Sequence, residues 1–421
     1  LEHTLREESI RRHDSLSVMA SRFDMPLADF TKALGSPLKF SDLLRTVGID
    51  PPTKPSPSNP NKRIPALAKT DKAMQDLLEH DNSLVAELAA ARLNVKSTLL
   101  ATRIERFLAM EYNGKLPIAL KYCGADTTWR WSGTMKANQQ NLPRVCGKPS
   151  DALRNSLRAP SGYKLVVCDL SGIELRVNHF LWKVVSTMLA YAADPKADLY
   201  RQYACRALNI ESPELVTKTQ RQYAKLCMLS LGYQTGAKKF AEIARQNGIT
   251  LTDAEAKAAV LQWRDIFFEI AAGWERCDKL LEAIADGGHV PVDDWGLFET
   301  RAGGILFLPR DTFISYPNLR KSGREWVYDD NKKREKLFGG KVCENLVSHL
   351  SRHVMSDAIL AFKKYQCAHM VHDEVVYVVP EAEAQDAYVE LQRLLSTPPV
   401  WWTELVTYSE GGVGDVYGSI K

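Results

Sequence analysis

The sequence predicts an α+β protein whose main sheet is assembled from strands that lie far apart along the chain. Two strand-like apolar runs, Leu165–Cys168 and Met370–Val379, are separated by about two hundred residues. Amphipathic segments typical of helices fill much of residues 1–120 and 182–300. Helices inserted between distant strands of one sheet are typical of an α+β architecture.

The composition narrows the class of protein. A chain of 421 residues is long enough for two or three domains with a substantial core. The formal net charge of +4 permits nucleic-acid binding but does not require it. No apolar run approaches the ~20 residues of a membrane-spanning helix, so we expect no membrane contact. The eight cysteines form no Cys-x-x-Cys pair, which favours reduced thiols in a cytoplasmic protein over a zinc site or a disulfide framework. Because the chain begins with Leu1 rather than methionine, we expect a processed or engineered fragment.

The first candidate site residue is Asp169, at the end of the earlier apolar run. A Ser-Gly turn follows it, and then an amphipathic segment that opens with Glu174. A strand this apolar is normally buried on both faces. An unpaired buried charge is too costly, so the carboxylate of Asp169 must be solvated, paired or bound to metal. The alternative is that Asp169 only caps the helix that follows.

A second acidic group lies in the later run, where His372, Asp373 and Glu374 interrupt a β-branched stretch that has no Gly or Pro. Three adjacent polar residues at this point predict the bend of a hairpin with an acidic tip. Two aspartates on neighbouring strands can hold two divalent cations about 4 Å apart, the arrangement used for in-line phosphoryl displacement. Magnesium fits such a site because it prefers carboxylate and phosphate oxygens and retains water ligands.

The third stretch is basic. Arg221, Lys225, Leu229 and Tyr233 are spaced four apart, so on one helix they would form a single stripe. Residues 216–240 contain five basic residues and no acidic ones. Such a stripe is ordinarily a solvated helix face. Cations that lead to an aromatic residue also suit a polyphosphate with a base beyond it.

Taken in their order along the chain, these three stretches resemble motifs A, B and C of family A DNA polymerases, the DNA polymerase I group, and most closely its bacteriophage branch. Asp169–Arg176, which is Asp-Leu-Ser-Gly-Ile-Glu-Leu-Arg, is similar to the family's Asp-Tyr-Ser-Gln-Ile-Glu-Leu-Arg. His372–Glu374 matches the His-Asp-Glu of its palm hairpin, and Arg221, Lys225 and Tyr233 match the cations and the tyrosine of its fingers helix.

A fourth stretch extends the resemblance to roughly residues 120–421. Thr128–Gly133 is similar to the family's Thr-Gly-Arg loop, and Gln139–Pro143 to its Leu-Gln-Asn-Ile-Pro. The chain departs from the pattern at four positions. Leu229 replaces an aromatic residue, Ser230 a glycine and Trp129 the glycine before Arg130, and Glu344 lies near where many members have Gln. The phage branch accepts Leu at the first of these positions, and the departures bear on nucleotide selectivity rather than on the reaction.

The resemblance implies a right-hand polymerase architecture with a palm sheet, helical fingers and a helical thumb. Residues 1–120 would form an incomplete thumb that contains a proline-rich loop at 50–60, although a plain helical adaptor is the alternative. Residues 121–181 and 301–421 would form the palm. Residues 182–300 would form the fingers, with helices expected at 181–193, 197–208, 216–246 and 253–285.

The resemblance also implies an activity and its partners. We expect a monomeric, template-directed DNA polymerase of replication or repair, in the bacterial host cytoplasm if it is of phage origin. It would extend a primed DNA template with deoxynucleoside triphosphates by two-metal phosphoryl transfer, with two Mg²⁺ ions for which Mn²⁺ could substitute, and any processivity or replisome partners are unidentified.

The site residues are carried over by position. Metal binding is assigned to Asp169, Asp373 and the carbonyl of Leu170; catalysis to the same aspartates, Glu374 and Lys225; nucleotide binding to Arg221, Lys225, Leu229, Tyr233 and Glu174; and DNA binding to Arg130, Gln140, Asn141 and His372. Each assignment has a structural alternative: a hairpin cap for Glu374, a solvated helix face for the cations, a core side chain for Tyr233, a helix-start residue for Glu174, and an ordinary polar loop for Arg130, Gln140 and Asn141.

Two other functions stay open. A single-subunit RNA polymerase would share the paired aspartates and the basic helix, but Glu174 and Glu374 argue against it. A catalytically silent relative that binds nucleic acid is disfavoured because the aspartates and cations are all retained. We expect no proofreading exonuclease in this chain, because residues 1–120 offer no strand-borne Asp-x-Glu. His349 and His353 have the spacing of a metal-binding pair, but no Glu follows His349 and no third ligand is evident, so zinc is not expected.

Overall fold

The computed structural model describes residues 1–420 except 57–58, 60, 97–98 and 331–332. Positions 57, 58 and 60 of the expected proline-rich loop therefore lie outside the described residues. The chain divides into two compact units: unit 1 is Leu1–Pro117 with Pro143–Ser156, and unit 2 is Ile118–Leu142 with Leu157–Lys421. Within the described ranges, no helix has the length and apolarity that crossing a membrane requires. All eight cysteines have free thiols, as the sequence predicts.

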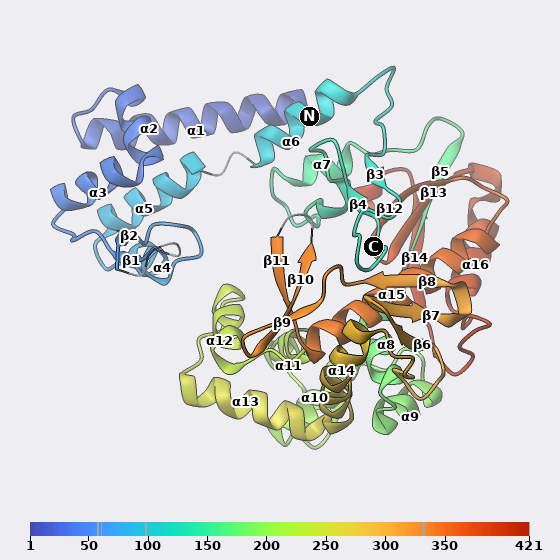
Figure 1. The fold of residues 1–421 in the computed structure, drawn as a ribbon. Helices are drawn as coiled ribbons and strands as arrows, with labels where there is room; N and C mark the ends of the chain where they lie inside the picture. Colours follow the sequence, from blue (N-terminus) through green and yellow to red (C-terminus); the bar gives the residue numbers. More distant parts are fainter. Residues whose placement is uncertain (57–58, 60, 97–98, 331–332, 421) are drawn as a thin grey trace. The chain divides into compact units, whose positions relative to one another are not determined.

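Unit 1 is helical with one short hairpin (Figure 1). Its elements are α1 (Glu2–Arg22), α2 (Leu27–Gly35), α3 (Pro37–Thr46), β1 (Thr53–Pro55), β2 (Arg63–Pro65), α4 (Lys72–Leu78), α5 (Ser83–Lys96), α6 (Leu99–Met110) and α7 (Asp151–Asn155). The sequence Asp81-Asn82-Ser83 predicts a break in this helical region, and the structure confirms one between α4 and α5. Buried Arg92 on α5 stacks its guanidinium over the Phe40 ring at 4.5 Å and donates to the carbonyl of Leu34, so it links α5 to α2 and α3.

Unit 2 is built on a four-stranded antiparallel sheet in the order β12-β13-β5-β14 (Figure 1). These strands are β5 (Tyr163–Leu170), β12 (Cys367–Val371), β13 (Glu374–Pro380) and β14 (Ser409–Gly414). The sheet thus joins segments more than two hundred residues apart, as the α+β prediction requires. One face of β5 presents Val166 and Cys168 to the main core, and the other presents Leu165 and Val167 to a smaller cluster with Tyr417. Alternate burial on both faces explains why the strand reads as a continuous apolar run.

Helices and smaller sheets complete unit 2. The helices are α8 (Ile173–Leu181), α9 (Val185–Ala193), α10 (Leu199–Leu208), α11 (Lys218–Leu231), α12 (Ala237–Gln246), α13 (Asp253–Ile266), α14 (Phe268–Asp286), α15 (Gly339–Ala361) and α16 (Ala384–Leu395). The remaining strands are β3 (Leu120–Lys121), β4 (Ser132–Gly133), β6 (Phe298–Arg301), β7 (Gly304–Phe307), β8 (Thr312–Ser315), β9 (Arg320–Ser322), β10 (Glu325–Asp330) and β11 (Lys333–Leu337). Short 3₁₀ turns lie at Gln139–Asn141, Pro213–Leu215, Leu308–Arg310, Glu381–Glu383 and Tyr417–Ser419.

Three expected helices are wrong in extent. The helix expected over 216–246 is two helices, because α11 ends at Leu231 and Gln234 adopts a left-handed conformation with φ 65°. The segment expected at 181–193 starts inside α8 and contains a turn in which Lys183 has φ 54°. The segment 253–285 is interrupted at Phe267, whose ψ of 51° does not continue a helix. Hydrophobic periodicity continues across such breaks, since each is only a few residues long.

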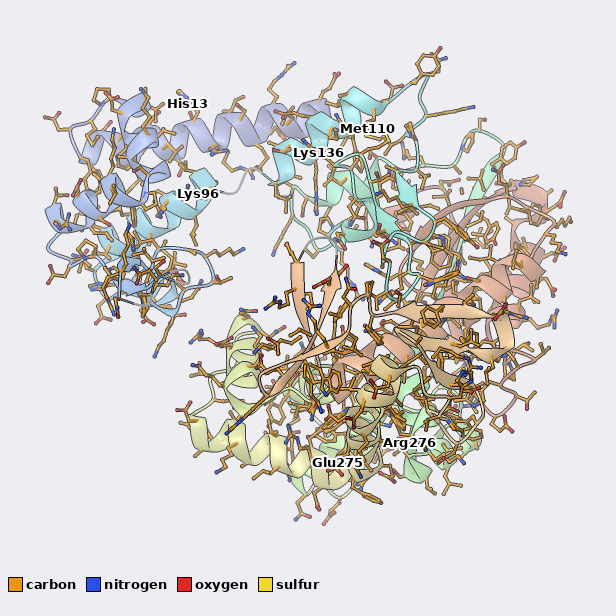
Figure 2. The ribbon with its side chains drawn as sticks, viewed as in Figure 1. His13, Lys96, Met110, Lys136, Glu275 and Arg276 are labelled. Carbon is orange, nitrogen blue, oxygen red and sulfur yellow. The ribbon has the colours of Figure 1, made fainter. Side chains whose placement is uncertain are left out.

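The helices of unit 2 are amphipathic and pack as the periodicity predicts. On α14, Trp274 and Cys277 are buried in the main core, whereas Glu275 is exposed and Arg276 pairs with Asp294 at 2.6 Å (Figure 2). Helix α15 packs against α14 and α8, and α16 packs against β5 and β14. Helix α16 therefore covers the sheet, and α15 supports α8, which follows β5 directly.

Candidate active site

The β12–β13 hairpin brings its acidic tip beside the end of β5. Val371 pairs with Glu374, so the loop between the strands consists of His372 and Asp373 alone. His372 takes the left-handed φ of 57° that a tight two-residue hairpin requires. The backbone N–H of Leu170, next to Asp169, donates to the carbonyl of Asp373 at 2.9 Å. The predicted bend is confirmed, and this hydrogen bond extends the pairing of β5 with β13 to the loop that carries Asp373.

The strand register adds a third carboxylate. Asp169 lies directly opposite Glu374 in the antiparallel β5–β13 pair. Opposed residues point to the same face with Cβ atoms about 4.5–5.5 Å apart. Glu374 is only 7% exposed, and the Tyr417 hydroxyl donates to its Oε1. This contact favours the alternative that Glu374 caps the hairpin. A direct catalytic role for Glu374 stays a prediction.

A pocket of about 420 Å³ opens beside the hairpin, entirely within unit 2. It brings together seven of the predicted site residues: Arg130, Gln140, Glu174, Lys225, Leu229, His372 and Asp373. Burial and the positive charge of Arg130 lower the pKa of His372, which favours its neutral form. Six predicted residues are absent from the described lining of this pocket: Asp169, Leu170, Arg221, Tyr233, Glu374 and Asn141.

Glu174 and Arg130 form an ion pair in the pocket wall. The Arg130 Nη1 atom lies 2.7 Å from Glu174 Oε1, with side chains 34% and 40% exposed. Ser348 on α15 donates to the same oxygen at 3.5 Å. Glu174 reaches this place because Gly172 adopts a left-handed φ of 60° and starts α8 immediately after β5. The two residues were assigned to different ligands from the sequence, and the structure shows that they also contact one another.

Helix α11 brings only part of the basic stripe to the pocket. Its start is fixed by a capping box between Thr217 and Gln220. Lys225 and Leu229, two successive turns, line the pocket, and Leu229 is 51% exposed. The prediction that Tyr233 continues the stripe on the same helix is wrong, because α11 ends at Leu231. Tyr233 lies beyond the helix and packs against the main core.

Tyr233 nevertheless lies in an environment that couples it to the site. Burial raises its pKa well above the usual value, and the negative charge of Glu174 raises it further. Its backbone lies against Gly340 at the start of α15, where a Cβ atom would come within 2.6 Å of the Tyr233 carbonyl oxygen. A substituent at Gly340 would therefore push against the segment that holds Tyr233.

Several pocket residues were not identified from the sequence. They are Trp131, Tyr200, Ser351 and Arg352, together with the backbone around Gly172. Tyr200 lies under both cations of α11, with its ring centre 5.3 Å from the Arg221 guanidinium carbon and 5.9 Å from Lys225 Nζ. Arg352 stacks on the Trp131 ring at 4.8 Å. No local pattern marks these residues, since they reach the pocket from several separate elements: Tyr200 from α10, Ser351 and Arg352 from α15, and Trp131 from the loop before β4.

The loop that carries Arg130 is anchored to α15 and β8. Trp129 has a φ of 61°, and its indole N–H donates to the carbonyl of Phe313 at 2.9 Å. The Nε atom of Arg352 donates to the Trp129 carbonyl at 3.2 Å. His349 Nδ1 lies 3.2 Å from the carbonyl oxygen of Thr128, which can only accept, so Nδ1 carries the proton.

The pair His349 and His353 forms a hydrogen-bonded chain through Thr312. Both Nε2 atoms contact the Thr312 hydroxyl, at 2.8 and 3.1 Å. Burial lowers the pKa of His349 to about 3 and that of His353 to about 4, so both are neutral near pH 7. Because Nδ1 of His349 is protonated, its Nε2 accepts from the Thr312 hydroxyl, whose oxygen in turn accepts from His353. The pair therefore supports the Arg130 loop.

The donor set at the hairpin suits a hard divalent cation. Asp169 and Asp373 offer carboxylate oxygens, and Leu170 offers a carbonyl. Across the described ranges, no group of three or more His, Cys, Asp or Glu side chains is placed to hold a metal ion. Magnesium commonly takes one or two protein carboxylates and completes its shell with water and substrate phosphates. The residues thus fit a cation that is shared with a phosphate ligand rather than one enclosed by protein.

Comparison with known structures identifies the class of fold. The chain is similar to the "POL domain of Pol1 from M. smegmatis complex with DNA primer-template and dNTP", with a TM-score of 0.73 and 18% sequence identity. The similarity covers 99% of this chain and 66% of that one. The expected α+β, right-hand polymerase architecture is therefore confirmed.

Sequence comparison identifies the family. The DNA polymerase family A profile matches residues 29–282, and the chain belongs to that family. It is 27% identical over 368 residues to DNA polymerase I of Pseudomonas aeruginosa, which covers 83% of this chain and 36% of the relative. The chain thus spans about a third of the length of that relative. The family match includes Asp169 and Lys225 but ends before Asp373, whose placement rests on the hairpin geometry.

Proposed function

We propose that this chain is a template-directed DNA polymerase that extends a primer with deoxynucleoside triphosphates. The observation that carries the proposal is the joining of β5 to the β12–β13 hairpin, which sets Asp169 and Asp373 at one end of the sheet. A pocket that opens there contains Lys225 for a polyphosphate and Glu174 for a sugar. The similar M. smegmatis domain is described in complex with a DNA primer-template and dNTP, which supports the same ligands here.

The parts of the hand follow from this proposal. We assign the palm to residues 121–181 and 301–421, the fingers to 182–300, and an incomplete thumb to 1–120. Unit 1 adds residues 143–156 to the N-terminal helices, which the sequence placed in the palm. Unit 2 contains the whole pocket, so the assigned chemistry requires the palm and fingers only.

Each pocket residue has a role in the proposed reaction. Asp169 and Asp373 would hold two Mg²⁺ ions, or Mn²⁺ in their place, with the Leu170 carbonyl as a further ligand. Bound divalent cations activate the primer 3′-hydroxyl and stabilise the leaving pyrophosphate. Lys225 would neutralise charge on the triphosphate as the bond to the α-phosphate breaks. Glu174 would occupy the space that a ribose 2′-hydroxyl requires.

The remaining assignments concern DNA. Arg130 would contact minor-groove acceptors at the primer end, which purine N3 and pyrimidine O2 supply at every base pair. In the structure its guanidinium is paired with Glu174, so contact with DNA requires that Arg130 exchange or share this partner. Gln140, which lines the pocket, and exposed Asn141 would contact the primer or template, and His372 would order the primer terminus.

Primer extension by the Asp373→Asn variant tests the proposal. An amide cannot supply the charge that a cation pair needs, so extension should fall by at least a hundredfold while primer–template binding is retained. Asp386→Asn, on the outer helix α16, is the matched control and should extend normally. Extension by Asp373→Asn within tenfold of the parent would contradict the metal assignment.

The same assay separates the alternatives. A parent that extends with ribonucleotides in preference would be an RNA polymerase, and one that binds DNA without extending would be a silent relative. We also retain, as predictions, the bacteriophage origin suggested by Leu229, a role in replication or repair, and the absence of 3′→5′ exonuclease activity from this chain. Steady degradation of single-stranded DNA with Mg²⁺ and no nucleotides would contradict the last of these.

A further inference from the structure

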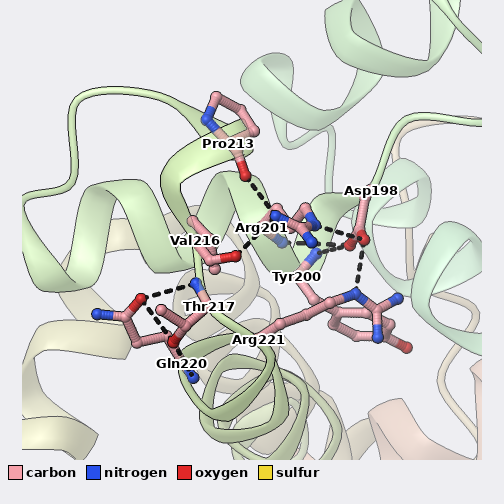
Figure 3. Close-up of polar contacts among 8 residues, drawn as sticks. All are labelled: Asp198, Tyr200, Arg201, Pro213, Val216, Thr217, Gln220 and Arg221. Carbon is pink, nitrogen blue, oxygen red and sulfur yellow. Dashed lines mark hydrogen bonds and ion pairs between the residues drawn. The ribbon is translucent and has the colours of Figure 1, made fainter.

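Arg221, the first cation of the basic stripe, is held by a carboxylate that the sequence did not single out. Its Nε atom donates to Asp198 Oδ2 at 2.6 Å. The two side chains are 39% and 31% exposed, so the pair lies at the edge of the protein rather than in the core. Tyr200, two residues after Asp198, lies beneath the guanidinium and also lines the pocket (Figure 3).

Asp198 is itself fixed in place. Its Oδ1 atom caps α10 by accepting from the backbone N–H groups of Tyr200 and Arg201, at 3.1 and 3.2 Å. The Arg201 side chain, 3.6 Å from Oδ2, donates to the carbonyls of Pro213 and Val216 at 2.6 and 2.8 Å (Figure 3). Pro213 opens the 3₁₀ turn that leads to α11, and Val216 directly precedes the N-cap of α11, Thr217. The start of α10 and the start of α11 are therefore tied together around one carboxylate.

The geometry of the pair leaves the phosphate-binding edge of Arg221 available. The guanidinium donates to Asp198 through Nε, and its Nη atoms donate to no acceptor among the residues that the structure describes. Two Nη groups can bind a phosphate as a fork. A carboxylate on Nε thus orients the fork without occupying it.

We propose that Asp198 is a positioning residue that orients Arg221 for the triphosphate of the incoming nucleotide. The inference rests on the proposed function, since it takes the ligand of Arg221 to be that triphosphate. A guanidinium already fixed by Asp198 and Tyr200 loses less side-chain freedom when the phosphate binds, and immobilising such a side chain otherwise weakens binding by about three- to tenfold.

The test is equilibrium binding of a deoxynucleoside triphosphate to a complex of the protein with a dideoxy-terminated primer–template, so that no chemistry is needed. Asp198→Ser keeps a helix-capping oxygen but is too short to reach Arg221. It should raise the nucleotide Kd about three- to tenfold, with an unchanged melting temperature. Asp198→Asn, which can still accept from Nε, should recover most of the loss.

Two further variants separate positioning from general effects of charge or packing. Asp194→Ser is the matched control, because Asp194 caps the nearby N–H of Lys196 at 2.9 Å and has no bond to Arg221; it should bind the nucleotide like the parent. In an Arg221→Lys background, which has no Nε–H, Asp198→Ser should add little to the Kd.

The outcomes are distinct from those of the proposed function. Equal nucleotide Kd values for the parent and Asp198→Ser, a Kd lowered by Asp198→Ser, or full additivity with Arg221→Lys would each overturn the positioning role. A parent that binds the triphosphate in the expected pattern but does not extend a primer would support Asp198 and refute the polymerase activity.

Discussion

Thr312 joins two buried imidazoles, and Thr312→Val removes the joining hydroxyl while keeping the shape of the side chain. The hydroxyl contacts His349 Nε2 at 2.8 Å and His353 Nε2 at 3.1 Å, and the two histidines are 0% and 4% exposed. Both nitrogens would lose this partner. Leaving a buried donor or acceptor unsatisfied costs about 1–3 kcal/mol, so the variant should lose roughly 2–6 kcal/mol of stability.

Urea unfolding of the parent, Thr312→Val and Thr312→Ser measures this effect. Serine keeps the hydroxyl and loses one methyl group, which costs about 1 kcal/mol when it is buried. Because His349 also donates to the Thr128 carbonyl, amide hydrogen exchange in residues 128–130 should be faster in Thr312→Val than in Thr312→Ser. A valine variant as stable as the serine variant would refute the hydrogen-bonded chain.

Three further predictions concern the pocket and its supports. Glu174→Ala should raise ribonucleotide incorporation relative to deoxynucleotide incorporation by about tenfold or more, because a pocket that excludes by clash loses discrimination when the obstacle is removed; an unchanged ratio in single-nucleotide assays would show that Glu174 only starts α8. Lys225→Ala should lower kcat/KM for nucleotides by about 10–100-fold, as expected for loss of a charged hydrogen bond, whereas exposed Gln222→Ala should not; weakened DNA binding with normal nucleotide kinetics would place α11 against DNA instead. Stability should decrease as the pH is lowered from 7 to 5. The pKa values of His349 and His353 are lowered from 6.5 to about 3 and about 4, so the unfolded state binds more protons below about pH 6.5, and each histidine costs about 1.4 kcal/mol of stability per pH unit down to its folded pKa. Urea midpoints that are flat between pH 7 and 5 would contradict this burial.

Local pattern in the sequence determined the segments that carry the chemistry. Asp169 could be placed at a strand end because an apolar run leads into a Ser-Gly turn, and His372 and Asp373 could be placed in a bend because polar residues interrupt a β-branched run. Strand ends and tight turns depend on neighbouring residues, so their signals are local. The family resemblance then predicted the right-hand polymerase architecture, and the structure confirms this architecture.

Only the tertiary structure decided how these segments meet. The pairing of Asp169 with Glu374 is a matter of strand register, which depends on contacts two hundred residues apart. Helix α11 ends before Tyr233, and Gln234 just beyond it adopts a left-handed conformation. Glutamine has no special preference for that conformation, so the sequence does not predict the break.

The supporting residues were invisible to the sequence for the same reason. Asp198 at the start of α10 contacts Arg221 on α11, and Thr312 on β8 joins His349 and His353 of α15. The spacing of His349 and His353 is visible in the sequence, but Asp198 and Thr312 each contribute one side chain from another element, which leaves no periodic pattern. The chain alone indicates which segments are candidates for a phosphoryl-transfer site, and the packing of distant elements determines which of their side chains lie together in the pocket.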